Sequence, residues 1–143
     1  MALKQITVLV NNRQGALVDI TEKLGTRGVN IRALSIADTE RFGILRMIVS
    51  DNEAAIEAVR DLGCLVQETE VVGVKIGDAP GKLSGALKVL SDAGINIEYL
   101  YAFCLRTVRH AYMVLRVADN LRAEKALEDA GYHMITDADV RKL

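Results

Sequence analysis

The chain repeats one sequence pattern twice, and this internal repeat constrains the fold more than any other feature. Each copy contains a Gly-x-Leu step, which is followed by a Gly-(Val/Ile)-Asn-Ile tetrad. The steps begin at Gly15 and Gly81 and the tetrads at Gly28 and Gly94, so both pairs lie 66 residues apart. Solenoids need roughly three or more stacked repeats, so a single duplication indicates two copies of one folding unit.

The second part of each copy recurs at a slightly larger spacing. Residues 43–51 match 111–119, and Gly63 matches Gly131, in both cases 68 residues apart. The two-residue insertion falls at 39–42 in the first copy and 106–110 in the second, where we expect hairpin loops, because loops tolerate insertions. We predict two domains, at residues 1–70 and 71–143.

Hydrophobic periodicity predicts the same elements in both copies. Ile6, Val8 and Val10 alternate with other residues as in a half-buried strand, and Leu17, Ile20 and Leu24 then follow helical spacing. The second copy shows the same change from strand alternation to helical spacing, first at Val72, Val74 and Ile76 and then at Leu83, Ala86, Leu87 and Leu90. Further strands are expected at about 30–38, 43–50 and 64–69, and at about 96–105, 111–117 and 132–136. A second helix is expected in each copy, because apolar residues follow helical spacing at Ile56, Val59 and Leu62 and at Ala123, Ala126, Leu127 and Ala130. Its N-cap is expected at Asp51 or Asn52 in the first copy and at Asp119 or Asn120 in the second. Residues 137–143 form either a helical turn or a strand extension.

The resulting order, βαββαβ in each copy, is that of the ferredoxin-like fold. The predicted class is therefore α+β, with two tandem ferredoxin-like units whose antiparallel sheets carry helices on one face, joined side by side. Each sheet then has a second face without helices.

Strand parity predicts where the aromatic side chains lie. If Leu100, Ala102 and Cys104 face the core, Tyr99, Tyr101 and Phe103 face away from the helices, beside Tyr112. Two interpretations remain open: some of these rings lie on the core side, or they form an exposed patch that a second subunit covers in a homodimer.

Composition excludes several classes of function. The net charge of −1, with acidic and basic residues interspersed, provides no basic surface for nucleic acid or an anionic membrane. No apolar stretch resembles a signal peptide or a membrane span, so we expect a cytoplasmic protein. Cys64 and Cys104 are too far apart in sequence to indicate a zinc or redox pair, and we expect two buried free thiols.

The duplicated motifs resemble those of the ACT domain family, small regulatory modules of amino-acid metabolism. Asn12-Arg-Gln-Gly-Ala-Leu with Gly-Val-Asn-Ile, and Asp78-Ala-Pro-Gly-Lys-Leu with Gly-Ile-Asn-Ile, carry the resemblance over essentially the whole chain. It implies that two units placed side by side bind a small ligand, usually an amino acid, and pass on its presence through a dimer or a partner enzyme. The ligand-binding residues that it implies are Asn12, Arg13, Gln14, Gly15, Ala16, Leu17 and Asn30 in the first copy, and Asp78, Ala79, Pro80, Gly81, Lys82, Leu83 and Asn96 in the second.

Elementary chemistry is compatible with such a ligand. The unpaired N–H groups at a helix N-terminus favour a carboxylate, and glycine allows close approach to the backbone. The Asn30 and Asn96 amides can donate and accept, while Asp78 or the Asn12 oxygen can accept from an ammonium group. The same glycines and asparagines also occur in turns without ligands, so a purely structural role stays open.

The chain departs from the family pattern at several positions. Gln14 stands where the family commonly has proline, and Ala79 in the second loop stands where the first has Arg13. The two loops are therefore not equivalent. Serine-binding members carry a histidine at the positions of Val10 and Ile76. The absence of this histidine here argues against serine as the ligand and favours an apolar amino acid.

Nothing in the sequence indicates catalysis, a cofactor or a metal. His110 and His133, expected in a hairpin loop and an edge strand, have no partner at the spacing of a triad or a metal site, and no glycine-rich phosphate loop is present. We therefore expect a binding protein and no enzyme. Two alternatives remain open: an oligomeric scaffold without a ligand, and a small enzyme with an unrecognised site.

Overall fold

The computed structural model describes residues 2–38, 41–104 and 109–143. The chain divides into two compact units, which are considered separately. The N-terminal unit is Lys4–Thr69, and the C-terminal unit is Glu70–Leu143 together with Ala2 and Leu3 from the beginning of the chain. Whether each unit is a domain that folds by itself remains a prediction, as does the boundary at residue 70.

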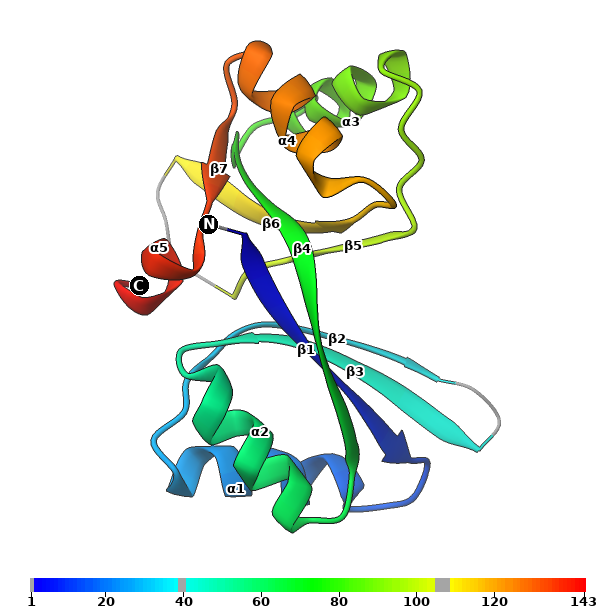
Figure 1. Ribbon diagram of the computed structural model, residues 1–143, viewed down its shortest axis with the longest axis vertical. Helices are drawn as coiled ribbons and strands as arrows, with labels where there is room; N and C mark the ends of the chain where they lie inside the picture. The colour runs from blue at the N-terminus through cyan, green and yellow to red at the C-terminus, as the bar shows by residue number, and fades with distance from the viewer. Residues whose placement is uncertain (1, 39–40, 105–108) are drawn as a thin grey trace. The chain divides into compact units, whose positions relative to one another are not determined.

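The N-terminal unit carries two helices on one face of an antiparallel sheet (Figure 1). Its elements are β1 (Leu3–Asn11), α1 (Ala16–Thr26), β2 (Ile31–Asp38), β3 (Phe42–Val49), α2 (Asn52–Asp61) and the first part of β4 (Leu65–Gly77). The strand order is β2-β3-β1-β4, and β3 runs antiparallel to both neighbours, with Ile6 opposite Met47. The core contains Ile20 and Leu24 of α1, which confirms the helical spacing expected there.

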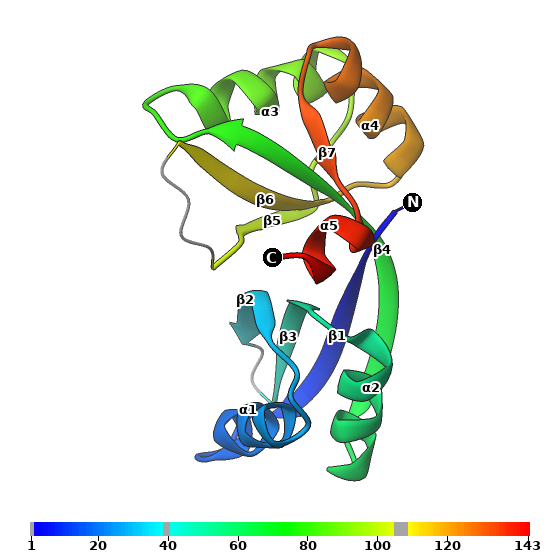
Figure 2. The same cartoon turned by 90° about the vertical axis from the view of Figure 1, so that its left-hand side faces the viewer.

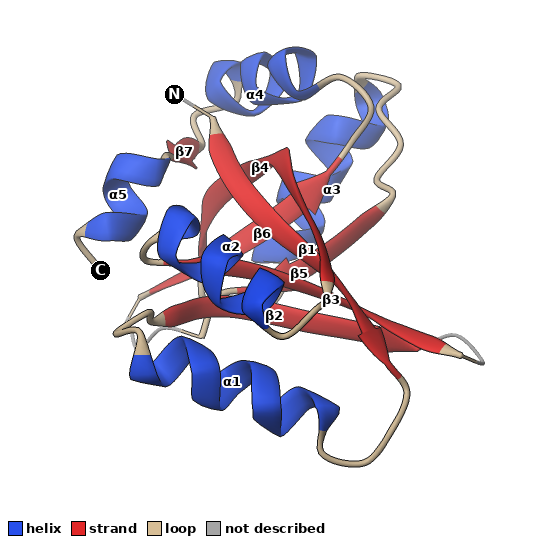
Figure 3. Cartoon of the chain, turned by 60° about the horizontal axis from the view of Figure 1, so that its bottom comes forward, coloured by secondary structure: helices blue, strands red, loops and turns tan. Residues whose placement is uncertain are grey.

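The C-terminal unit repeats this arrangement. Its elements are the second part of β4, α3 (Lys82–Asp92), β5 (Tyr99–Ala102), β6 (His110–Arg116), α4 (Asn120–Asp129), β7 (His133–Ile135) and α5 (Asp137–Arg141). β4 lies between β6 and β7, and β5 pairs with β6 (Figure 3). Leu90 and Leu127 are fully buried in its core. The predicted fold class, two tandem ferredoxin-like units, is confirmed.

Local chemistry explains where the helices begin. Asp51 and Asp119 occupy equivalent positions, and each side chain accepts a hydrogen bond from a backbone N–H in the first turn, of Ala54 and Arg122 respectively. An Asp N-cap stabilises a helix by satisfying one of its unpaired donors. The aspartates, rather than the neighbouring asparagines, are therefore the N-caps.

The aromatic residues lie on the predicted face, but they do not form an exposed patch. Tyr101 is paired with Val114, and the neighbouring core residues Met113 and Leu115 point to the other side. Tyr101 and Phe103 are nevertheless only 9% and 8% exposed. The expectation of an exposed aromatic surface was wrong, and the argument for a homodimer that depended on it loses its basis.

The last residues form a short helix, α5, over the face of the C-terminal sheet that α3 and α4 leave uncovered. Lys75, Tyr112 and His133 are cross-strand neighbours there, and Asp139 and Leu143 line the same hollow of about 250 Å³. Figure 2 shows α5 on the side of the sheet away from α3 and α4. Thr136 and Asp139 form a capping box that starts α5, so the helical alternative for residues 137–143 is the right one.

Several detailed expectations need correction. β5 begins at Tyr99 instead of residue 96, one continuous β4 replaces two separate strands, and His110 begins β6. Leu83 and Leu62, expected on core faces, are 37% and 39% exposed, because they lie at a helix start and end. Cys104 is exposed and Cys64 half-buried, although both thiols are free. Ala130, another expected core residue, is the exposed C-cap of α4. The predicted hairpin loops lie largely outside the described residues.

Candidate functional site

Each predicted ligand loop ends in a glycine that starts the following helix without a side-chain cap. Gly15 and Gly81 have φ values of 85° and 84°, in the left-handed region, and are the N-caps of α1 and α3. A side chain would be strained there, so glycine is required at both positions. The first N–H of each helix, of Ala16 and of Lys82, donates to a loop carbonyl, of Arg13 and of Ala79 respectively. No side chain caps the N–H groups of the next residues, so an anionic ligand can approach those.

The two loops are held in the same way. The Asn12 N–H donates to the Arg41 carbonyl at 3.2 Å, and the Asp78 N–H donates to the Arg109 carbonyl at 3.0 Å. These bonds tie each loop to the start of the second strand of the adjacent β-hairpin, at its turn end, and leave the Asn12 and Asp78 side chains exposed. The loop backbones are therefore ordered before any ligand binds.

The predicted loop residues do not all face solvent. Ala16 is 6% exposed and Leu17 packs against the same core, so these two side chains serve the packing of α1. The remaining predicted residues of the loops are exposed: Asn12, Arg13, Gln14, Gly15, Asp78, Ala79, Pro80, Gly81, Lys82 and Leu83.

Asn30 lies at the opposite end of the sheet from residues 12–17. Its backbone exchanges hydrogen bonds with Ser50, just beyond the end of β3, whereas Asn11 is paired with Phe42 at the beginning of β3. The eight residues of β3 span roughly 25 Å at about 3.4 Å per residue. One unit alone therefore does not bring both parts of the predicted pocket together.

The Asn30 and Asn96 side chains are free to bind a ligand. Both residues are exposed, and neither side chain has a hydrogen bond within the described parts of the chain. A turn asparagine that bonds its own backbone would show such a bond. These amides are therefore available, and their removal should cost the fold little.

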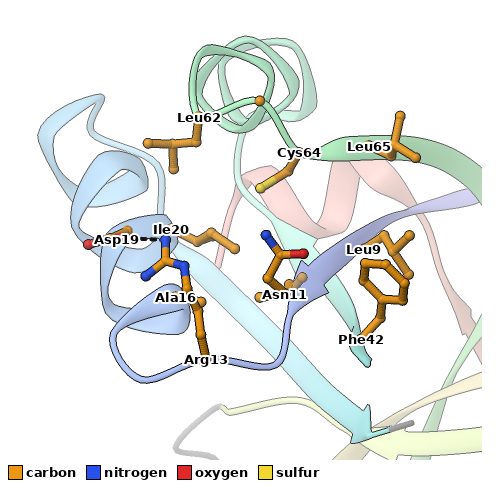
Figure 4. A pocket seen from close by; sticks show the side chains of 12 residues that line it. Leu9, Asn11, Arg13, Ala16, Asp19, Ile20, Phe42, Leu62, Cys64 and Leu65 are labelled. Carbon is orange, nitrogen blue, oxygen red and sulfur yellow. Dashed lines mark hydrogen bonds and ion pairs between the residues drawn. The ribbon is translucent and has the colours of Figure 1, made fainter. Parts of the chain in front are cut away.

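A cavity of about 260 Å³ adjoins the first loop, within the N-terminal unit (Figure 4). It lies between the ends of β1 and α2 and the beginnings of α1 and β4. Its lining residues are Leu9, Val10, Asn11, Arg13, Ala16, Asp19, Ile20, Phe42, Leu62, Gly63, Cys64 and Leu65. Of the predicted site residues, it includes Arg13 and Ala16.

The rim of this cavity carries an ion pair, and part of its wall is apolar. Arg13 Nη2 donates to Asp19 Oδ2 at 3.2 Å, and both side chains are at least half exposed. Leu9, Phe42 and Leu65 provide apolar walls, with the Cys64 thiol among them. An opposed charge pair beside apolar walls suits a small zwitterion with an apolar side chain.

The sequence analysis missed Asp19 and Cys64 as candidate site residues. Neither belongs to a recognised motif, but a position-by-position comparison of the copies shows that both positions differ. Asp19 corresponds to Gly85, which has no charge, and Cys64 corresponds to Tyr132, which is much larger.

No metal site or membrane-spanning helix was found in the part of the chain that the structure describes. Two carboxyl groups have shifted pKa values, and both are remote in sequence from the loops. Burial raises the pKa of Glu124, with Glu128 adding to the effect, while the Thr136 backbone N–H lowers the pKa of Asp139. Neither group indicates an acid or base for catalysis.

Comparison with known proteins decides the family. The family model of the ACT domain pair matches residues 1–143. The chain belongs to the ACT domain pair family. The resemblance inferred from the duplicated Gly-x-Leu and Gly-x-Asn-Ile motifs is thereby confirmed over the whole sequence.

Three relatives illustrate what this ACT domain pair is similar to. A Bacteroides thetaiotaomicron protein of known crystal structure is 34% identical, with a TM-score of 0.91 over 100% of this chain and 98% of that one. The regulatory subunit of aspartate kinase from Thermus thermophilus shares the fold, with a TM-score of 0.67 at 15% identity over 90% of this chain and 92% of that one. The acetolactate synthase small subunit of Mycobacterium avium is 28% identical over 100 residues, which is 68% of this chain and 60% of that subunit.

Proposed function

We propose that this ACT domain pair is a regulatory protein that binds an amino acid and signals its presence through dimerisation or a partner enzyme, without catalysing a reaction itself. The observation that carries the proposal is the pair of ordered loops, each leading through a left-handed glycine into an uncapped helix N-terminus. Two related proteins point the same way, since one is named as a regulatory subunit and the other as a small subunit of a larger enzyme. We place its action in the cytoplasm.

The proposed pocket combines a loop of one unit with an asparagine of another. The helix N-terminus behind Gly15 or Gly81 receives the carboxylate, because its N–H groups and the positive end of its dipole point there. The exposed amide of Asn30 or Asn96 completes the site. Since loop and asparagine lie at opposite ends of one sheet, the ligand must join two units.

Joining two units is also how the ligand would act. A ligand can shift an equilibrium between assembled and separated units only as far as it binds the assembled form better. The edge strand β2 provides a surface for such assembly, because it pairs only with β3 among the described strands and carries Leu34 and Ile36, which are 37% and 51% exposed. Unpaired strand edges readily pair with another chain.

The test is a thermal-shift screen of the twenty amino acids, followed by calorimetry on those that raise the melting temperature. A ligand present at about 100 times its dissociation constant adds about 2.7 kcal/mol to the free energy of unfolding. The variant Asn30→Ala/Asn96→Ala should keep its stability in the absence of ligand, because both side chains are exposed and unbonded, and should lose the ligand-induced shift.

Ser91→Ala serves as the matched control, since it removes an exposed polar side chain from α3 away from the loops. Binding that survives in the double asparagine variant contradicts the assignment of these two residues. A screen without any shift favours the second candidate, a scaffold that assembles without a ligand.

A further inference from the structure

We propose that the cavity of the N-terminal unit is a binding site for one apolar α-amino acid per chain, and that the C-terminal unit has lost the equivalent site because its own side chains fill it. The inference depends on the proposed function for the class of ligand, but it places the ligand inside a single unit. A site inside one unit therefore depends on different residues than a pocket formed by two units.

The polar rim matches the two charges of an α-amino acid. Arg13 can bind the carboxylate and Asp19 the ammonium group, and the two side chains lie next to each other, with 3.2 Å between Nη2 and Oδ2. Their side chains are 58% and 50% exposed, and ion pairs at such exposed positions contribute little to stability. Replacing this pair by contacts to a ligand therefore costs the protein little.

The walls match an apolar side chain of limited size. Leu9, Phe42 and Leu62 are 36%, 39% and 39% exposed, so each leaves apolar surface that a ligand can cover. The volume of about 260 Å³ lies just below the range of roughly 300–1,000 Å³ that is typical of drug-sized ligands. A leucine, isoleucine or valine molecule is smaller than such ligands and suits the cavity.

In the C-terminal unit, an aromatic ring occupies the corresponding space. Cys64 corresponds to Tyr132, which packs against the core of that unit. The tyrosine oxygen lies 3.2 Å from the position that a Cβ atom on Gly85 would take, and Gly85 corresponds to Asp19. The glycine therefore makes room for the tyrosine hydroxyl group, and the carboxylate of the rim is absent.

The stem of a second side chain takes the place of the Asn11 side chain, although the residue as a whole is exposed. Ala16 corresponds to Lys82, whose Cγ lies 3.1 Å from the position of a Cβ atom on Gly77, and Gly77 in turn corresponds to Asn11. The apolar walls are also lost, because Lys75 and His110 stand where the N-terminal unit has Leu9 and Phe42. Only the N-terminal unit keeps the space, the charges and the walls together.

The experiment transfers the C-terminal arrangement to the N-terminal unit. Isothermal calorimetry with L-leucine, L-isoleucine and L-valine compares the full-length chain with the variant Asp19→Gly/Cys64→Tyr. We expect one bound ligand per chain for the unmodified protein and at least a 10-fold weaker affinity for the variant. Asp19→Asn, a change at an exposed position with little expected effect on stability, should also weaken binding at least 10-fold.

The control is Asp92→Asn, because Asp92 is an exposed, ion-paired carboxylate on α3, as Asp19 is on α1. Unchanged affinity in both Asp19 variants overturns the inference while leaving the proposed function intact. Loss of affinity in Asn30→Ala/Asn96→Ala with normal affinity in the Asp19 variants leads to the same conclusion. The reverse result supports the cavity and contradicts the pocket between two units. The absence of binding of these three ligands by the unmodified chain overturns the inference about the cavity, while the screen of the twenty amino acids decides the proposed function.

Discussion

The two units have the same fold but differ in what fills the space between their helices and the last strand of each sheet. In the N-terminal unit the half-buried Cys64 lines a cavity beside Arg13, whereas in the C-terminal unit the hydroxyl group of Tyr132 lies beside Gly85 and the stem of Lys82 beside Gly77. The backbone is unaffected, since Cys64 and Tyr132 donate the same hydrogen bond to the preceding helix. The two copies of a duplicated fold can therefore keep the same backbone and differ in the side chains at corresponding positions.

The two units also differ on the face of the sheet opposite to the two long helices. In the C-terminal unit α5 covers part of this face, and Gly73 lies beneath Leu3 and Ile135. The residues of the first copy that correspond to α5 lie in β4, and Thr7 stands at the position of Gly73. The C-terminal unit thus has additional packing that its counterpart lacks.

The largest effect is expected from removing equivalent core leucines. Leu24 and Leu90 are both fully buried, so Leu24→Ala and Leu90→Ala should each lower the free energy of unfolding by about 2–5 kcal/mol in urea titrations. Leu121→Ala, at a position that is 80% exposed, should change it by less than about 0.5 kcal/mol. A loss below about 1 kcal/mol in only one of the leucine variants would show that the two cores are not packed alike.

Exchanging Gly73 and Thr7 tests the difference between the helix-free faces. A Cβ atom on Gly73 would lie 2.7 Å from Leu3 Cδ2 and 3.1 Å from Ile135 Cβ, so Gly73→Thr should cost about 1–3 kcal/mol through overpacking. Thr7→Gly should cost about 1–2.5 kcal/mol, because glycine has more freedom in the unfolded chain and the buried Gln5 amide loses its Thr7 Oγ1 acceptor at 3.0 Å. Thermal and urea unfolding measure both, and a harmless Gly73→Thr would contradict the close packing at this position.

A smaller effect is expected at the N-caps, where the units are alike. Asp51→Ala and Asp119→Ala each remove an acceptor for a backbone N–H and should cost about 0.5–2 kcal/mol in urea titrations. The corresponding Asn variants keep an acceptor and should retain most of the stability. A clear difference between the two alanine variants would indicate that one helix depends more on its cap than the other.

The smallest effect concerns pH and only α5. The Thr136 backbone N–H lowers the pKa of Asp139 in the folded protein, so ionised Asp139 stabilises α5 above its unfolded pKa of about 3.9. This contribution is lost as the pH falls through the lower folded pKa. Amide exchange should show α5 losing protection in that range, and Asp139→Asn should remove this pH dependence. Equal loss in α1 would point instead to unfolding of the whole chain.

Much of the fold could be predicted because its signals are local. Glycines such as Gly15 and Gly81 stand where the backbone is left-handed, Asp51 and Asp119 stand where helices need acceptors, and apolar spacing distinguishes strands from helices. The copies also check each other, since an element seen in one is expected in the other.

The errors concern features that depend on packing between distant residues. Strand parity assigns Tyr101 and Phe103 to one face of the sheet, but it does not predict what covers that face. Their burial and the position of α5 are therefore tertiary effects that it could not predict. The cavity is likewise a difference in side-chain volume between corresponding positions, so it follows from comparing Cys64 with Tyr132 and not from any motif.

The most direct test of ligand sensing by one unit is an NMR titration of the full-length chain with L-leucine. Saturable amide shifts confined to the residues around Arg13, Asp19, Cys64 and Leu65, with none around Lys82 and Tyr132, are the predicted result. Shifts of equal size at both sets of residues, or no saturable shift at either, would contradict it.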